Sequence, residues 1–332
     1  MNKNSKITLP RINWQEIGIL VALVLYGSFV AIRNESFLTA SNINDILRNA
    51  SILLIMGLGM MQVIITRGID LSVGSMIALC GMTITRIMIV VPQIPPIVAM
   101  IMGMILGAFL GSINGVLVAY GNIPPIIATM GMMNVDRGIC YIVSGGEWVS
   151  AYEMTDGFKN IALGEFLGIN YLIWISIIVF TIGAFFLKQT NVGRRIYAVG
   201  SNPESAEVSG INVPKTKLMV YSLNGMLAGL SGILWVSRYA SAQGNTAMGY
   251  EMNCVASCVL GGVSVSGGSG RPFGLLLGVL FFGLLYNSLS MIYVSPYAEK
   301  AIEGVIILLA VMINSLILRR QKLQSQRKGE LQ

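Results

Sequence analysis

The sequence predicts an all-α polytopic membrane protein with about ten transmembrane helices. Of its 332 residues, 54% are hydrophobic and only 11% are charged, whereas a soluble domain carries about 25% charged residues. The apolar residues form runs of about 18 to 25, the length that a helix needs to cross a hydrocarbon core about 30 Å thick. Together, these observations exclude a water-soluble fold.

The apolar runs follow one another along nearly the whole chain, so we expect a single membrane domain over 1–332 with a membrane region from 15 to 318. The predicted spans are 15–33, 43–65, 70–91, 95–120, 123–145, 169–188, 216–238, 250–266, 272–293 and 297–318. The fourth span contains Gly103, Gly107 and Gly111, four residues apart on one helix face. Such small-residue ridges let helices approach closely in lipid, so we expect a helix contact there.

The distribution of basic residues predicts the orientation. An even number of spans puts both termini on one side, and that side holds 15 of the 22 Lys and Arg residues. By the positive-inside rule this side is the cytosol. The connection 189–215 is then cytoplasmic, and the more acidic connection 146–168 is periplasmic.

The cytoplasmic connection carries the signals of a helix of about two turns. Asn202 is a favoured N-cap, Pro203 is favoured at the first helical position, Glu204 suits the positive end of the helix dipole, and Gly210 offers a left-handed stop. A helix this short is unstable alone, so it is either an ordinary capped loop helix or an element that docks on a partner protein. In the second case, the small side chain of Ala206 leaves room for the partner surface.

Several polar residues lie within the predicted spans or at their ends. They could line a path that offers hydrogen bonds to solute hydroxyls, or they could hold helices together. Asp70 lies three residues after Arg67, which favours an ion pair at a helix start. Asp136 and Arg137 lie inside the fifth span. The candidate pathway residues are Asp70, Ser72, Asn114, Asn134, Glu251 and Asn253.

The sequence favours neither an enzyme nor a cofactor site. The chain has no histidine, and the pair Cys254 and Cys258 lacks further metal ligands. No G-x-x-x-x-G-K-[ST] phosphate loop is present, and the glycine-rich stretch 261–272 has no lysine at the required place. We interpret that stretch as a tight turn between spans, and we expect no cofactor, metal or nucleic-acid partner.

Five stretches of the chain resemble the ribose, xylose and autoinducer-2 branch of ATP-binding-cassette (ABC) importer permeases. They are GIDLSVGS (68–75), NGVLVAYGNIPPIIATMG (114–131), RGICYIVSGGE (137–147), GRRIYAVGSNPESAEVSGINVPKTK (193–217) and GYEMNCVASCVLGGVSVSGGSGRPFG (249–274). They cover predicted spans two through nine in the family's order. The sequence departs from the family's usual pattern at Met132, Asp136 and Asn253.

The resemblance implies a multi-pass permease of the bacterial inner membrane that imports a monosaccharide such as ribose. It also implies a second permease subunit, identical or paralogous, separate ATPase subunits and a periplasmic sugar-binding protein. The segment 200–211 is then the element that contacts the ATPase, with Asn202, Pro203, Glu204, Ala206, Glu207, Ser209 and Gly210 as the coupling residues. The alternative is an ion-coupled secondary transporter of a small polar solute. The sequence disfavours it, because no predicted span has a carboxylate at its middle with a clear ion-binding partner.

Overall fold

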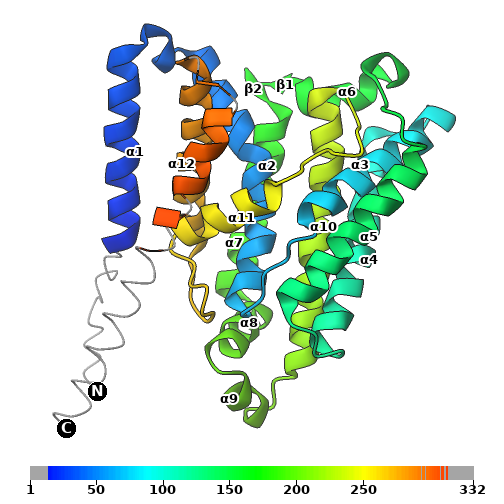
Figure 1. Cartoon of the computed structure of the whole chain (residues 1–332), viewed down its shortest axis with the longest axis vertical. Helices are drawn as coiled ribbons and strands as arrows, with labels where there is room; N and C mark the ends of the chain where they lie inside the picture. The colour runs from blue at the N-terminus through cyan, green and yellow to red at the C-terminus, as the bar shows by residue number, and fades with distance from the viewer. Residues whose placement is uncertain (1–13, 293, 296, 307, 310–311, 313–332) are drawn as a thin grey trace, which may run out of the picture.

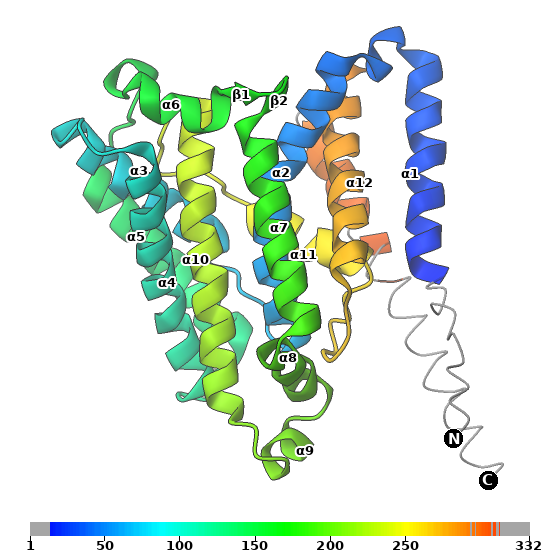
Figure 2. The ribbon, with the colours of Figure 1, turned by 180° about the vertical axis from the view of Figure 1, so that it is seen from behind.

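The computed structural model describes residues 14–292, 294–295, 297–306, 308–309 and 312. Within these residues the chain is almost entirely helical, and eight helices are long and apolar enough to cross a bilayer. They stand roughly side by side as a bundle (Figures 1 and 2). The eight are α1 (Trp14–Arg33), α2 (Ala40–Ile65), α3 (Val73–Val90), α4 (Pro96–Ala119), α5 (Pro125–Ser144), α7 (Tyr171–Gln189), α10 (Val213–Tyr239) and α12 (Pro272–Met291). The all-α polytopic fold class is confirmed.

The eighth predicted span, 250–266, is wrong as a continuous crossing. Helix α11 (Tyr250–Leu260) has 11 residues, enough for only about half of a hydrocarbon core. Non-helical chain precedes and follows it, and Gly249 and Gly262 have left-handed backbones that bound the helix on its two sides. Figure 1 shows α11 lying across the bundle at mid-height. Of the tenth predicted span, 297–306 is helical and most of the rest lies outside the described residues.

The predicted glycine ridge on α4 is a helix contact. A β-carbon at Gly107 would overlap the backbone of Gly225 and Gly229 on α10, and one at Gly103 would meet Gly229 and Ile233. The contact is reciprocal, because a β-carbon at Gly225 would overlap the backbone of Gly107 and Gly111. Helices α4 and α10 therefore touch backbone to backbone, as the spacing predicts.

We expect Gly107→Leu to lower the stability of the purified protein, because the added side chain has no space between the α4 and α10 backbones. Overpacking of this kind costs about 1–3 kcal/mol or more. Gly131 on α5 is the matched control, since nothing lies within 4 Å of a β-carbon there. Thermal unfolding in detergent should show a lower transition temperature for Gly107→Leu than for Gly131→Leu, and equal values would contradict the close contact.

The outer faces of the bundle are apolar. Leu25 on α1, Ile105 on α4 and Phe185 on α7 are 64–65% exposed, and Ile142 on α5 is 80% exposed. Soluble monomers rarely expose apolar surface of this extent, which is typical of helices that contact lipid chains.

Shorter elements gather at the two ends of the bundle. At one end lie the 3₁₀ turns η1 (Glu35–Leu38) and η2 (Ala151–Glu153), helix α6 (Asp156–Leu163), and strands β1 (Glu165–Phe166) and β2 (Ile169–Asn170), which pair antiparallel. At the other end lie α8 (Asn191–Ser201) and α9 (Pro203–Val208) (Figure 1). The predicted periplasmic and cytoplasmic connections thus lie at opposite ends.

Candidate functional site

The short helix expected in the 189–215 connection is present as α9, and its local chemistry is as predicted. Asn202 is the N-cap, and its side chain accepts a hydrogen bond from the Ser205 amide at 3.0 Å. Pro203 opens the helix, Glu204 lies in its first turn, and Gly210 has a left-handed backbone with φ of 79°. The helix is the outermost described element at this end of the bundle (Figure 1).

The outward face of α9 differs from the expected one at a single residue. Ala206 is 4% exposed, so its side chain packs against the rest of the chain. Val208 is instead 91% exposed, and Glu204, Glu207 and Ser209 are also exposed. The surface that α9 presents is therefore one apolar residue among acidic and hydroxyl side chains.

Helix α8, which precedes α9, was not predicted. Its side chains at Ile196 and Val199 are fully buried against the bundle, and Thr190 caps it by accepting from the Gly193 amide at 3.0 Å. Val192, Ile196 and Val199 repeat at helical spacing, a signal that could have revealed the helix. Because α8 packs on the bundle, it holds α9 in place.

The end of α8 is joined to the turn between α2 and α3 through Arg67. The Arg67 guanidinium donates from Nε to the Gly200 carbonyl at 2.7 Å and from Nη2 to the Ser201 carbonyl at 2.5 Å. A β-carbon at Gly200 would overlap the Ile65 carbonyl at the end of α2. Gly200, in the last turn of α8, therefore touches the last residue of α2 directly.

The glycine-rich stretch 261–271 completes this contact and is more than a turn between spans. The Gly268 amide donates to the Ile65 carbonyl at 2.9 Å, and the Tyr197 hydroxyl of α8 donates to the Gly270 carbonyl at 2.8 Å. We call Ile65, Arg67, Gly200, Ser201 and Gly268 the cytoplasmic junction, after the side of the membrane that the sequence predicts for it. The cytoplasmic junction links α9 to α2 and, through the glycine-rich stretch, to α11.

The predicted ion pair between Arg67 and Asp70 is wrong. Among the salt bridges of the described residues, none joins these two side chains. The left-handed backbone of Arg67, with φ of 64°, lies in the turn that carries the guanidinium to α8. Asp70 is fully buried and accepts from the Ser72 amide at 3.0 Å and the Ser72 hydroxyl at 2.7 Å.

Asp70 is the centre of a buried polar cluster that includes one residue missed by the sequence analysis. Asn224 of α10 donates to Asp70 Oδ2 at 2.9 Å, and Asn114 of α4 donates to the Ser72 hydroxyl at 2.8 Å and to Asp70 Oδ1 at 3.3 Å. All four side chains are 0% exposed. The cluster ties the start of α3 to α4 and α10, and any pathway role of Asp70, Ser72 and Asn114 stays a prediction.

The other candidate pathway residues lie apart from this cluster. Asn134 is exposed on α5 and donates to the Met130 carbonyl of its own helix at 3.0 Å. Glu251 opens α11 and approaches α3, since its carboxylate lies 2.6 Å from where a β-carbon of Gly74 would be. Asn253 Oδ1 is buried without a hydrogen-bond partner in the described residues, as are both carboxylate oxygens of Asp136.

Comparison with known proteins decides the family. Residues 42–311 match the model of a family described as branched-chain amino acid transport system / permease component. The chain belongs to this permease family. The match extends from α2 into the last described helix, so it includes the cytoplasmic junction and the buried polar cluster. Taken with the eight apolar helices, membership makes the chain a multi-pass protein of the bacterial inner membrane.

Several relatives of this permease have assigned solutes. The ribose import permease protein RbsC of Escherichia coli (strain K12) is 41% identical over 298 residues, which cover 89% of this chain and 92% of the relative. The galactose/methyl galactoside import permease protein MglC of Salmonella typhimurium is 33% identical, over 97% of this chain and 99% of the relative. The L-arabinose ABC transporter permease protein AraH of Azospirillum brasilense is 33% identical, over 91% of this chain and 88% of the relative. No solved structure matches the chain.

Proposed function

We propose that this permease is the membrane-spanning subunit of an ABC importer and carries a monosaccharide across the inner membrane. The observation that carries the proposal is the 41% identity to a ribose import permease over 92% of that protein. Relatives named for galactose and arabinose support a monosaccharide as the class of solute and leave the particular sugar open. A periplasmic sugar-binding protein, a separate ATPase and a second permease subunit complete the proposed assembly.

In this proposal, α9 couples ATP hydrolysis in the partner subunit to movement of the membrane helices. Its exposed residues Glu204, Glu207 and Val208 form the contact with the ATPase, and a basic surface around an apolar recess would complement them. Movement of α9 reaches Gly200 and Ser201, then Arg67 and the end of α2. The cytoplasmic junction thus gives the ATPase a short, contiguous physical route to the membrane helices.

The purified permease alone should not hydrolyse ATP, because the chain contains no phosphate-binding loop. Hydrolysis should appear only when the ATPase subunit is added, and phosphate release with and without that subunit measures this. Sustained hydrolysis by a preparation shown by mass spectrometry to lack other ATPases would overturn the assignment of ATP hydrolysis to a partner.

One observation favours a second candidate function, an ion-coupled secondary transporter. The Asp136 side chain is 0% exposed on α5, and neither carboxylate oxygen has a hydrogen-bond partner in the described residues. Carboxylates buried in spans are costly and often carry ions or protons. If Asp136 coupled transport to an ion gradient, Asp136→Asn would abolish uptake driven by that gradient, whereas ATP-driven uptake does not need a titrating group there.

A further inference from the structure

An open pocket of about 610 Å³ is lined by residues of α2, α10, α11 and α12. The start of α2 and the end of α10 lie at the end of the bundle opposite α9 (Figure 1). The pocket walls come from the first turns of α2, the last turns of α10 and the last turns of α12, and Tyr250 adds the start of α11. In the predicted orientation this is the periplasmic end. The pocket therefore leads from the periplasm to the beginning of the half-length helix α11, and its volume is that of a small-molecule site.

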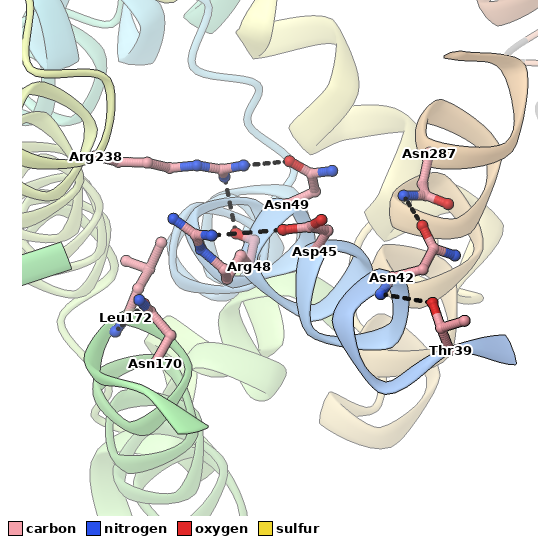
Figure 3. Close-up of polar contacts among 9 residues, drawn as sticks. All are labelled: Thr39, Asn42, Asp45, Arg48, Asn49, Asn170, Leu172, Arg238 and Asn287. Carbon is pink, nitrogen blue, oxygen red and sulfur yellow. Dashed lines mark hydrogen bonds and ion pairs between the residues drawn. The ribbon is translucent and has the colours of Figure 1, made fainter. Parts of the chain in front are cut away.

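The first wall of the pocket presents hydrogen-bond donors and acceptors side by side. Arg238 of α10 donates to the Arg48 carbonyl at 2.9 Å and to the Asn49 side-chain oxygen (Figure 3). Asn49 thus accepts through Oδ1, and among the described residues no hydrogen bond from its Nδ2 is formed. Asp45 adds an exposed carboxylate, 3.4 Å from Arg48 Nη1. A ligand hydroxyl could accept from Asn49 and donate to Asp45.

The opposite wall carries a buried amide oxygen that lacks a partner. Asn287 donates through Nδ2 to Asn42 Oδ1 at 2.8 Å (Figure 3), and Asn42 donates to the Phe37 carbonyl at 2.7 Å. This chain of bonds fixes which atom of the Asn287 amide stays free. Asn287 Oδ1 is buried without a hydrogen-bond partner in the described part of the chain. A buried acceptor without a donor is costly, and Asn287 lines the pocket, so a ligand hydroxyl that reaches this oxygen would satisfy it.

Aromatic rings form the rest of the pocket. The Trp235 ring packs edge to face on Tyr250 with centroids 5.0 Å apart, and it lies 5.2 Å from Tyr239. Tyr239 is 52% exposed, so its ring remains available to a ligand. The lining holds one guanidinium, Arg238, and two carboxylates, Asp45 and Glu299, a balance that does not favour an anion. Aromatic faces beside paired donors and acceptors suit a molecule with apolar C–H surfaces and several hydroxyls.

We propose that this pocket binds a neutral monosaccharide on its way from the periplasmic end toward α11. The proposal rests on the proposed function and adds the place where the sugar first meets the permease. A site on a transport path must release its ligand inward, so the affinity is weak, in the millimolar range. Trp235 lies in the pocket wall, which makes binding visible as a change in its fluorescence.

The test uses Trp235 as the reporter. The chain has four tryptophans, so replacing Trp14, Trp148 and Trp174 with Phe leaves Trp235 alone. This full-length variant is reconstituted with its ATPase and binding protein, and the sugar is chosen as whichever of D-ribose, D-galactose and L-arabinose the complex takes up with ATP. The permease is then titrated alone in nanodiscs with that sugar, and with L-leucine as the control solute.

We expect the transported sugar to change Trp235 emission saturably, with no response to L-leucine. Tyr239→Leu should raise the half-saturating concentration about three- to tenfold by removing an aromatic contact. The matched control is Tyr120→Leu at the other end of the bundle, where Tyr120 is 55% exposed, and it should not shift the curve.

Two results would overturn the pocket assignment while leaving the proposed function intact. One is a variant that takes up sugar with ATP but shows no response of Trp235 to that sugar. The other is a response that is unchanged by Tyr239→Leu. If instead no assembly takes up any of the three sugars with ATP, the proposed function fails, and that outcome is separate from the titration.

Discussion

A permease with Val208→Arg should insert and fold normally but no longer co-purify with its ATPase. Val208 is 91% exposed on α9, so the larger side chain meets no neighbour within the chain. In the proposed contact, the added guanidinium faces a surface that complements Glu204 and Glu207, and like charges there repel. Loss of a central contact costs about 2–4 kcal/mol, or up to about a thousandfold in affinity. Affinity purification followed by quantification of the bound ATPase measures this.

The matched control is Leu167→Arg. Leu167 is also highly exposed, at 78%, but it lies in the turn between β1 and β2 at the opposite end of the bundle. That variant should bind the ATPase as the unmodified permease does. Ala206 is unsuitable as the test position, because its side chain is buried and an arginine there would disturb α9 itself. Normal ATPase binding by Val208→Arg would show that α9 is only a connector.

Arg67→Ala should have a different effect, keeping the ATPase bound but breaking its connection to transport. The substitution removes two hydrogen bonds from a charged donor to the Gly200 and Ser201 carbonyls, each worth about 1.5–3 kcal/mol. We expect sugar uptake in proteoliposomes to fall at least about tenfold, while the assembled complex still hydrolyses ATP. Arg67→Lys should be intermediate, because an ammonium cannot span both carbonyls as the guanidinium does.

Arg33→Ala provides the control for loss of a single positive charge. Arg33 is exposed at the end of α1, where its guanidinium lies 5.7 Å from the Phe29 ring centroid. That variant should keep normal uptake. Equal sugar uptake by Arg67→Ala and Arg33→Ala would show that the cytoplasmic junction does not couple the ATPase to transport.

Local features of the sequence predicted the local structure well. The apolar runs mark the eight long helices to within a few residues, because only intrahelical hydrogen bonding satisfies the backbone in lipid. The caps Asn202 and Gly210 mark α9, and the spacing of Gly103, Gly107 and Gly111 marks the contact with α10. Each of these signals is contained within a single turn or helix face.

The features that the sequence did not predict depend on contacts far apart in the chain. Arg67 bonds to carbonyls 133 and 134 residues away, and backbone acceptors leave no mark in the sequence. Asn224 reaches Asp70 across 154 residues, so the buried cluster could not be assembled from spacing alone. The helix in the predicted run 250–266 stops at Leu260, where Gly261 and Gly262 follow. This glycine pair was a local signal that the prediction of a continuous span overlooked.

Proteoliposomes that contain the permease, its ATPase and its sugar-binding protein test the central claim most directly, with labelled sugar outside and the nucleotide and ion gradients set separately. The predicted result is accumulation that requires ATP and both partners and is indifferent to proton or sodium gradients. Accumulation by the permease alone, driven by an ion gradient and abolished by Asp136→Asn, would contradict an ABC importer and identify the chain as an ion-coupled transporter.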